Sequence, residues 1–214
     1  MAISAQGIAA SRGGFRLAVD AFGADATGTA VVGRNGAGKT TLLLALQDLI
    51  AHDGRVQRPA RCAGVFAQPA LLRGSVLGNI EAVGAANGRA RRALELVDLA
   101  TFAARDVRQL SSGERQRLSL ARALALEPEA LFLDEAFANV DADGRGPLRA
   151  VVRAYVERTG CALVVATQTL ADARALCRDV VVLEEGRVVQ AAVLDAALQA
   201  PTPYLAALAA EAQI

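Results

Sequence analysis

The chain is poor in the residue types that build metal sites and disulfide frameworks. Its 214 residues include three cysteines, one histidine, one methionine and no tryptophan. Cys62, Cys161 and Cys177 form no C-x-x-C pair, and their apolar surroundings predict reduced, buried thiols, as in a cytosolic protein. The only histidine, His52, stands beside Asp53 near a predicted helix end, where we expect a solvated side chain. A metal site built from histidine and cysteine is therefore not expected.

Long apolar runs and an excess of one charge sign are also missing. No run of about 18 apolar residues occurs, so we expect no membrane-spanning helix. The first residues lack a basic region followed by an apolar run, so we expect no secretory signal. The net charge is +1 and the arginines are scattered without a basic tail, which argues against a nucleic-acid partner. The hydrophobic content of 53% hints instead at an apolar docking surface.

Lysine is nearly absent as well: 22 of the 23 basic residues are arginine, and the only lysine is Lys39. It lies in residues 33–40, G-R-N-G-A-G-K-T, which fit the phosphate-binding pattern G-x-x-x-x-G-K-[ST]. A compact ammonium can sit between β- and γ-phosphate oxygens, whereas a planar guanidinium is too wide for such a loop. Chance produces the pattern in roughly one chain in a hundred of this size. The residues of this predicted phosphate loop are Gly33, Arg34, Asn35, Gly36, Ala37, Gly38, Lys39, Thr40 and Thr41.

Buried strands alternate with helices along the chain. Residues 29–32 read as a strand that leads into the phosphate loop, and a helix from Thr40 to Ile50 follows, with Leu49 among its apolar residues. Residues 77–108 are predicted to be mostly helical, with one apolar face made by Ala90, Ala93, Leu94, Val97 and Leu99. The other predicted strands are 63–67, 130–133, 162–166 and a hairpin of 179–183 with 187–190; the other predicted helices are 113–125, 144–158, 169–177 and two short ones split by Pro201 and Pro203. This order predicts an α/β fold, with a mostly parallel sheet, helices on both faces and a minor antiparallel part.

Four polar segments follow the phosphate loop. Gln68 ends a predicted strand, and residues 110–114, L-S-S-G-E, open a helix. Asp134 and Glu135 end the apolar strand L-F-L-D-E, and Asp141 follows six residues after Glu135. Each segment alone has an ordinary structural explanation: a polar strand end, a helix cap or a solvated acidic pair. Their combination behind a phosphate loop leaves little room for coincidence.

The set resembles the ATP-binding-cassette (ABC) ATPase family, and the resemblance covers nearly the whole chain. L-S-S-G-E stands where that family usually has L-S-G-G-Q, and R-Q-R-L-S-L-A-R-A-L follows it. The resemblance implies a single phosphate-loop (RecA-like) domain over 1–214, with a core of about 1–68 and 113–214 and a helical subdomain of about 69–112 that faces a membrane partner. It also implies that two cassettes, in our expectation two identical chains, pair head to tail. Each ATP would lie between one chain's phosphate loop and the signature segment, residues 110–114, of the other.

The resemblance also assigns roles to the matching residues. Lys39 would neutralise the β- and γ-phosphates, and Thr40 and Gln68 would coordinate Mg²⁺, with Asp134 at or near the metal. Glu135 would be the general base that orients the attacking water. Gln68 would also couple the helical subdomain to the γ-phosphate, and Asp141 matches the loop that communicates across the dimer. The residues presented to the γ-phosphate bound by the second chain would be Ser111, Ser112, Gly113 and Glu114.

Gln168 departs from the family pattern, because the family usually carries a histidine there, just after a strand. Its amide can donate a hydrogen bond to the γ-phosphate, but it cannot carry a proton or a positive charge. One interpretation is slowed hydrolysis, with a barrier raised by about 1–3 kcal/mol. The other is that Gln168 is an accepted substitute with nearly normal turnover.

Other positions depart as well. Ser112 replaces a signature glycine and places a side chain where backbone meets phosphate. Glu114 replaces a glutamine, and Ala136 replaces the proline that commonly follows the acidic pair. The side chain that stacks on adenine is not obvious, and the candidates are Phe15, Arg12 and Ser11.

The leading hypothesis is the ATPase subunit of an ABC transporter, bound to integral membrane permease subunits on the cytoplasmic face of the cell membrane. Residues 65–72 look like the corresponding segment of bacterial importers, and small subunits for oxyanions such as tungstate are similar in length and tail. One alternative is a nucleotide-gated binding module that hydrolyses ATP negligibly. A second is a soluble, non-transport ABC ATPase, although coiled coils and a basic stripe are missing. A small-molecule kinase would leave residues 110–117 unexplained.

Overall fold

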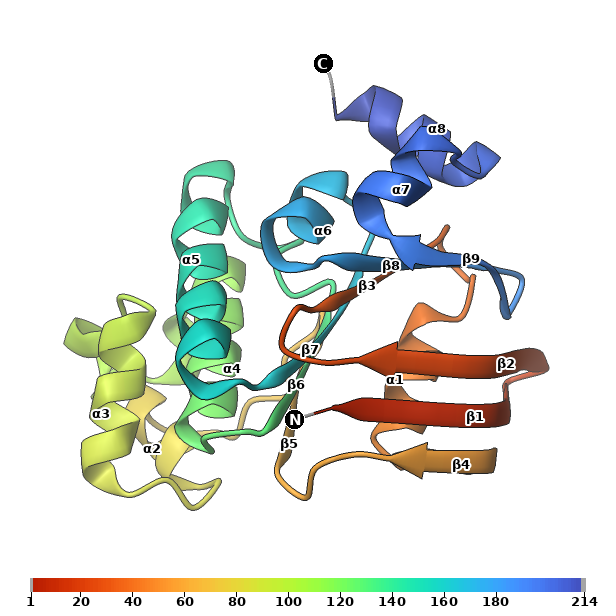
Figure 1. Ribbon diagram of the computed structural model, residues 1–214. Helices are drawn as coiled ribbons and strands as arrows, with labels where there is room; N and C mark the ends of the chain where they lie inside the picture. Colours follow the sequence, from red (N-terminus) through yellow and green to blue (C-terminus); the bar gives the residue numbers. More distant parts are fainter. Residues whose placement is uncertain (1, 213–214) are drawn as a thin grey trace.

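A computed structural model describes residues 2–212, and over these residues the strands form one nine-stranded sheet (Figure 1). The strand order is β4-β1-β2-β9-β8-β3-β7-β6-β5. The strands are β1 (Ile3–Arg12), β2 (Phe15–Ala24), β3 (Thr29–Val32), β4 (Asp53–Gln57), β5 (Cys62–Val65), β6 (Ala130–Asp134), β7 (Ala162–Thr167), β8 (Asp179–Glu184) and β9 (Arg187–Val193). The helices are α1 (Lys39–Leu46), α2 (Val76–Glu81), α3 (Asn87–Leu96), α4 (Ser112–Ala125), α5 (Ala142–Thr159), α6 (Leu170–Leu176), α7 (Leu194–Gln199) and α8 (Pro203–Glu211).

The parallel part of the sheet is the part that positions the site. β3 pairs in parallel with β7 and β8, and β6 pairs in parallel with β5 and β7. The carboxyl ends of these strands therefore lie at one edge of the sheet, where α/β proteins bind their ligands. The antiparallel pairs are β1 with β2, β1 with β4, and β8 with β9. The predicted α/β class, with a mostly parallel sheet and a minor antiparallel part, is confirmed.

Helices cover both faces of the parallel strands, as predicted. Successive residues of β6 face opposite layers: Phe132 packs in the cluster that contains α1, whereas Leu131 and Leu133 belong to the cluster built with α4 and α5. α1 contacts β1 as well as β6 and β7, so it lies between the antiparallel strands and the parallel ones. Figure 1 shows α4 and α5 on the side away from β1, β2 and β4. The core strands β3, β6 and β7 are mainly apolar, since both of their faces are buried, and their buried polar residues are Thr29, Asp134 and Thr167.

Phe132 is expected to be one of the most important side chains for stability. It is 1% exposed and fills the layer between β6 and α1. Because truncation leaves a cavity that the packed layer cannot close, Phe132→Ala should lower the free energy of unfolding by about 3–5 kcal/mol. Urea unfolding measures this loss. Leu49→Ala is the control, since Leu49 is 59% exposed and its truncation should cost less than about 0.5 kcal/mol. Equal losses in the two variants would contradict this description of the core.

The first helix after the phosphate loop is shorter than predicted. It ends at Leu46, not Ile50, and Asp48 adopts a left-handed conformation with φ of 55°. The Asp48 carboxylate lies 3.0 Å from His52 Nε2 and 2.9 Å from Arg58 Nη2, which stabilises a turn in place of a further helical turn. Leu49 consequently lies outside the apolar face assigned to it. The expectation of a solvated His52 is also wrong, because its side chain is only 10% exposed against Asp48.

The remaining predicted elements occur where expected, within a few residues at their ends. The five residues of the predicted apolar face in 77–108 are all buried, and Pro203 begins α8 after α7. Cys161 and Cys177 are buried free thiols as predicted, but Cys62 is only partly buried. Our sequence-based expectations do not include β1, β2 and β4. Over residues 2–212, no helix combines the length and the apolar character needed to cross a bilayer.

Candidate functional site

The phosphate loop connects β3 to the first residue of α1, as the sequence predicts. Gly38 is the N-cap of α1, has φ of 105° and supplies no side-chain hydrogen bond to the helix. A Cβ atom on Gly38 would lie 2.7 Å from the Phe15 ring, and one on Gly33 would collide with the carbonyl oxygen of Leu183. Glycine is therefore required at both positions. The first N–H groups of α1 remain available, which is the arrangement that binds phosphate at helix N-termini.

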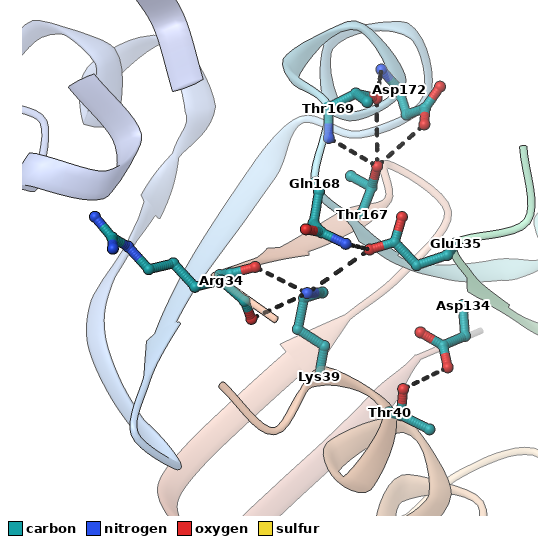
Figure 2. Close-up of polar contacts among 10 residues, drawn as sticks. Arg34, Lys39, Thr40, Asp134, Glu135, Thr167, Gln168, Thr169 and Asp172 are labelled. Carbon is teal, nitrogen blue, oxygen red and sulfur yellow. Dashed lines mark hydrogen bonds and ion pairs between the residues drawn. The ribbon is translucent and has the colours of Figure 1, made fainter. Parts of the chain in front are cut away.

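Lys39 lies inside the loop and is 7% exposed. Its Nζ donates hydrogen bonds to the carbonyl oxygens of Gly33, at 2.8 Å, and Arg34, at 3.3 Å (Figure 2). The same atom lies 3.7 Å from Glu135 Oε1. Burial lowers the pKa of the Lys39 ammonium, and the nearby carboxylates of Glu135 and Asp134 oppose that change. The loop thus holds one partly desolvated positive charge at the edge of the sheet.

Asp134 ends β6 and faces the start of α1. The Thr40 hydroxyl donates a hydrogen bond to its Oδ2 at 2.7 Å, as Figure 2 shows. Its other oxygen, Oδ1, is buried and has no hydrogen-bond partner among the described residues. Burial raises the pKa of the Asp134 carboxyl, while the Thr40 hydrogen bond and the charge of Lys39 lower it. An unpaired buried carboxylate oxygen is costly, so it indicates a ligand that this site is built to hold.

Glu135 follows Asp134 directly but points in a different direction. Its φ is 50°, in the left-handed region that non-glycine residues rarely adopt, and its N–H donates to the Ala166 carbonyl at 2.9 Å. This conformation costs of order 1 kcal/mol or more, and it turns the Glu135 side chain toward the phosphate loop. The two acids of the predicted pair therefore have different partners: Asp134 contacts Thr40, and Glu135 contacts Lys39.

Gln168 follows β7 and completes the cluster. Its Nε2 donates a hydrogen bond to Glu135 Oε1 at 2.8 Å (Figure 2). A cavity of about 300 Å³ has the following lining residues: Arg12, Phe15, Asn35, Gly36, Gly38, Lys39, Thr40, Thr41, Asp134, Glu135 and Gln168. Two of the three adenine-stacking candidates, Arg12 and Phe15, thus border it, while Ser11 does not line it. A larger cavity of about 700 Å³ among α3, α4 and α5 contains none of the predicted site residues.

The other predicted site residues do not line the cavity around Lys39. Gln68 is exposed beyond the end of β5, and Ser111 and Ser112 are exposed at the start of α4. Ser111 and Glu114 form a capping box, in which the Ser111 hydroxyl accepts from the Glu114 N–H and the Glu114 carboxylate accepts from the Ser111 N–H. This gives the glutamate at 114 a structural reason, since the S-x-x-E pattern stabilises a helix start. The roles of these residues toward nucleotide stay predictions.

Two side chains that our sequence reasoning left without a role hold the segment before Gln68. Gln116, 1% exposed on α4, donates to the Phe66 carbonyl at 3.1 Å. Asn139 donates to the Ala67 carbonyl at 2.8 Å. The partners are 50 and 72 residues apart in the chain, so only the folded arrangement reveals them. These two hydrogen bonds connect α4 and the segment after Glu135 to the chain just after β5.

Comparison with known proteins agrees with this geometry. The family model described as ABC transporter matches residues 25–138. The aliphatic sulfonates import ATP-binding protein SsuB 2 of Frankia alni is 42% identical over 163 residues, which cover 74% of this chain and 66% of that protein. SsuB 3 of Paraburkholderia xenovorans is 35% identical over 88% of this chain and 79% of its own length. The molybdenum import ATP-binding protein ModC of Mycobacterium tuberculosis is 36% identical over 80% of this chain. The chain spans only 55% of that ModC.

Two solved structures share the fold at low sequence identity. A bacterial Atm1-family ABC exporter with ATP bound has a TM-score of 0.87 at 20% identity, covering 99% of this chain and 42% of that one. A dimeric ATP-binding cassette in a post-hydrolysis state, bound to ADP and Pi, has a TM-score of 0.80 at 21% identity, covering 89% and 98%. The fold is therefore that of an ATP-binding cassette.

Proposed function

The chain belongs to the ABC transporter family, and from this premise we propose that it binds and hydrolyses ATP to power import through a membrane transporter. One observation carries the proposal. Lys39, Asp134, Glu135 and Gln168 come from three separate parallel strands and their loops, yet they border a single cavity. A buried cation, two acids with different partners and a hydrogen-bond donor are the groups that phosphoryl transfer to water requires.

ATP would bind with its phosphates against the phosphate loop. The Lys39 ammonium would exchange its bonds to the Gly33 and Arg34 carbonyls for phosphate oxygens, a stronger, charge-assisted contact. The N-terminus of α1, which has no side-chain cap, would contribute its N–H groups. Both sources of positive potential are in place before the nucleotide arrives, so little reorganisation is needed when charge develops on the transferring phosphoryl group.

The residues around Asp134 fit Mg²⁺. Mg²⁺ takes oxygen ligands, and the unpaired Asp134 Oδ1 and the Thr40 hydroxyl are two such oxygens on the same side of the loop. When bound, the ion neutralises phosphate charge and orients the terminal phosphate. Gln68 stays a proposed third ligand, and it would have to reach the metal from its exposed position after β5.

Glu135 is the proposed general base. Because Asp134 would be occupied by Thr40 through one oxygen and by Mg²⁺ through the other, Glu135 would be the acid left to accept a proton from water. Gln168 fixes one oxygen of the Glu135 carboxylate through its amide, which limits rotation of that carboxylate about its last bond. The amide can also be aimed at the γ-phosphate, but it cannot transfer a proton.

Histidine at position 168 is expected to raise turnover. Gln168→His adds a group that carries positive charge and a proton at the same place, so kcat should rise by about 5- to 150-fold, equivalent to about 1–3 kcal/mol. Steady-state phosphate release measures kcat. Gln168→Asn is the control, since its shorter side chain cannot reach Glu135 and adds no charge. If the histidine variant turned over ATP at or below the wild-type rate, slowed hydrolysis would be wrong and Gln168 would be an accepted substitute.

A second cassette is part of the proposal. The signature residues Ser111 and Ser112 are exposed and do not line the cavity of their own chain, which supports their use by another chain. The direction of transport is supported by the relatives, which are named for import of aliphatic sulfonates, taurine, molybdenum and Fe(3+). Sulfonates carry an oxyanion group, so the relatives named for sulfonate import favour an oxyanion substrate. The relatives named for Fe(3+) import do not favour one.

Co-purification tests the transport function. A tagged chain expressed in its native cell should be recovered from the detergent-solubilised membrane fraction together with integral membrane subunits. Addition of Mg·ATP should alter the yield of that complex, because nucleotide closes the pair of cassettes. Recovery of the chain without any membrane protein under all nucleotide conditions would favour the soluble, non-transport alternative.

A further inference from the structure

A polar cluster outside the cavity fixes the loop that carries Gln168. Thr167 Oγ1 donates to Asp172 Oδ2 at 3.0 Å, and the Thr169 N–H donates to Thr167 Oγ1 at 3.1 Å (Figure 2). The Asp172 N–H donates to Thr169 Oγ1 at 3.3 Å. Both neighbours of Gln168 are therefore bonded to Asp172, Thr167 to its carboxylate and Thr169 to its backbone N–H. Gln168 is left as the member of this loop that reaches Glu135.

Asp172 is held from its other side by a helix that takes no part in the cavity. Arg149 of α5 donates from Nε at 2.7 Å and from Nη2 at 2.6 Å to Asp172 Oδ1. The Arg149 side chain is 19% exposed and that of Asp172 is 8% exposed, so water competes little for either charge. Each Asp172 oxygen thus has one fixed partner: Oδ1 binds Arg149, and Oδ2 binds Thr167. A carboxylate bound on both sides cannot rotate without leaving a buried charge or hydroxyl unpaired.

Capping of α6 explains only part of this arrangement. Thr169 is the N-cap of α6, and its hydroxyl accepts from the Asp172 backbone N–H. The Thr167 hydroxyl supports this cap, because it lies 3.3 Å from the Thr169 hydroxyl and accepts from the Thr169 N–H, but the cap makes no use of the Asp172 carboxylate. Thr167 is 1% exposed at the end of β7. The bonds of the Asp172 carboxylate to Thr167 and to Arg149 lie outside the cap and connect the end of β7 to α5.

We propose that Asp172, fixed by Arg149, is a positioning residue that acts through Thr167 to hold the Gln168 amide against Glu135. The consequence for turnover rests on the proposed ATPase function, whereas the consequence for the Gln168 side chain does not. The same contacts join Gln168 to α5, whose first turn is capped by Asp141 through a 3.0 Å bond from the Gly144 N–H. The segment expected to face a second cassette is thus rigidly connected to the loop of Gln168.

Thr167→Val tests the proposal directly. Valine keeps the shape and the β-branch but removes the hydroxyl, so the protein should fold. The readout is the ¹H–¹⁵N side-chain signal of the Gln168 amide in the ligand-free chain, identified by its loss in Gln168→Ala. In the wild type this amide should be ordered, with slow hydrogen exchange and a high heteronuclear NOE. In Thr167→Val and Asp172→Asn its exchange should accelerate by about tenfold or more, because the bond to Glu135 is no longer held.

Tyr155→Phe is the matched control. Tyr155 is 5% exposed, and its hydroxyl donates to the Pro128 carbonyl at 3.0 Å, so this variant also removes one buried hydroxyl bond, but far from the cavity. It should lower the melting temperature by no more than Thr167→Val, whose hydroxyl contacts both Asp172 and Thr169, and it should leave the Gln168 signal unchanged. An unchanged Gln168 amide in Thr167→Val and Asp172→Asn would overturn the proposal. So would an equal change in Tyr155→Phe, since the amide would then report general loosening.

Turnover supplies an independent test. Thr167→Val should lower kcat by about fivefold with KM for ATP within about twofold, and the same substitution in Gln168→Ala should change kcat by less than about twofold. Additive losses in the double variant would show that Thr167 acts on turnover by another route and would overturn the proposal. If no variant and not even the wild type hydrolysed ATP, the proposed function would fail, while the amide signal would still decide the positioning role.

Discussion

Glu135→Gln is expected to lower ATP turnover by about 10²- to 10⁴-fold, the range in which a single general base usually contributes. Glutamine has nearly the same shape but cannot accept the proton of the attacking water. Because Lys39 and Asp134 are untouched, the affinity for ATP should stay within about threefold of the wild type. Phosphate release and isothermal titration with ATP give the two quantities. The bound ATP should persist, so light scattering should also find a dimer in the presence of ATP.

Glu127→Gln is the control for this variant. Glu127 pairs with Arg89 on the surface at 2.9 Å, so neutralising it removes the same charge without touching the cavity. Its turnover should stay within about twofold of the wild type. If Glu135→Gln retained wild-type turnover, Glu135 would not be the base, and the division of roles between the two acids would be wrong. Loss of ATP binding in that variant would place Glu135 among the binding residues instead.

Lys39→Ala is expected to weaken ATP binding by about 10- to 150-fold, the loss that follows removal of one charged hydrogen-bond partner. Turnover at a fixed ATP concentration should fall at least as far. Truncation also removes the bonds that Lys39 makes to Gly33 and Arg34, but these are replaced by phosphate contacts when nucleotide binds. Isothermal titration measures the affinity, and the melting temperature of the ligand-free variant checks that it is folded.

Two further substitutions make the Lys39 result specific. Arg16→Ala removes one positive charge from an exposed position on β2 and should leave the ATP affinity within about twofold. Lys39→Arg keeps the charge but should still lose most of the affinity, because the guanidinium is too wide for the loop. Full ATP binding by Lys39→Arg would remove the explanation for the single lysine in a chain that otherwise uses arginine.

The phosphate loop and the acidic pair could be predicted from the sequence because local chemistry dictates them. The tight loop needs glycine at Gly33 and Gly38, and an acid such as Asp134 stands out at the end of an apolar strand. The parallel strands were predictable for the same kind of reason, since apolar runs such as 130–133 and 162–166 are buried on both faces. These elements carry their signal within a few residues.

Other features depend on contacts between distant segments and could not be predicted. The early end of α1 follows from the Asp48 contacts with His52 and Arg58, which only a turned chain can make. The hairpin of β1 and β2, by contrast, has a local signal that our reading missed: Gly13 and Gly14 form a two-residue turn with positive φ, and Phe15, Leu17 and Val19 alternate along β2.

The environment of Gln168 illustrates the same limit within the site. That Gln168 replaces a histidine is visible in the sequence. The hydrogen bond from the Gln168 amide to Glu135, however, joins residues 33 positions apart. The ion pair of Asp172 with Arg149 spans 23 residues and joins two helices. Neither α5 nor α6 contains a sequence pattern that predicts a contact with the loop of Gln168. The contact of Gln168 with Glu135 therefore depends on how the helices and strands pack, and the sequence alone does not predict it.

Phosphate release from ATP by the purified wild-type chain, with Mg²⁺ and with a chelator, is the measurement that tests the central claim most directly. The account predicts turnover that saturates with ATP and disappears when Mg²⁺ is removed, because Thr40 and the unpaired Asp134 oxygen would then lack the ion that they fit. Saturated ATP binding with no phosphate release in the presence of Mg²⁺ would contradict it and would favour a nucleotide-gated binding module.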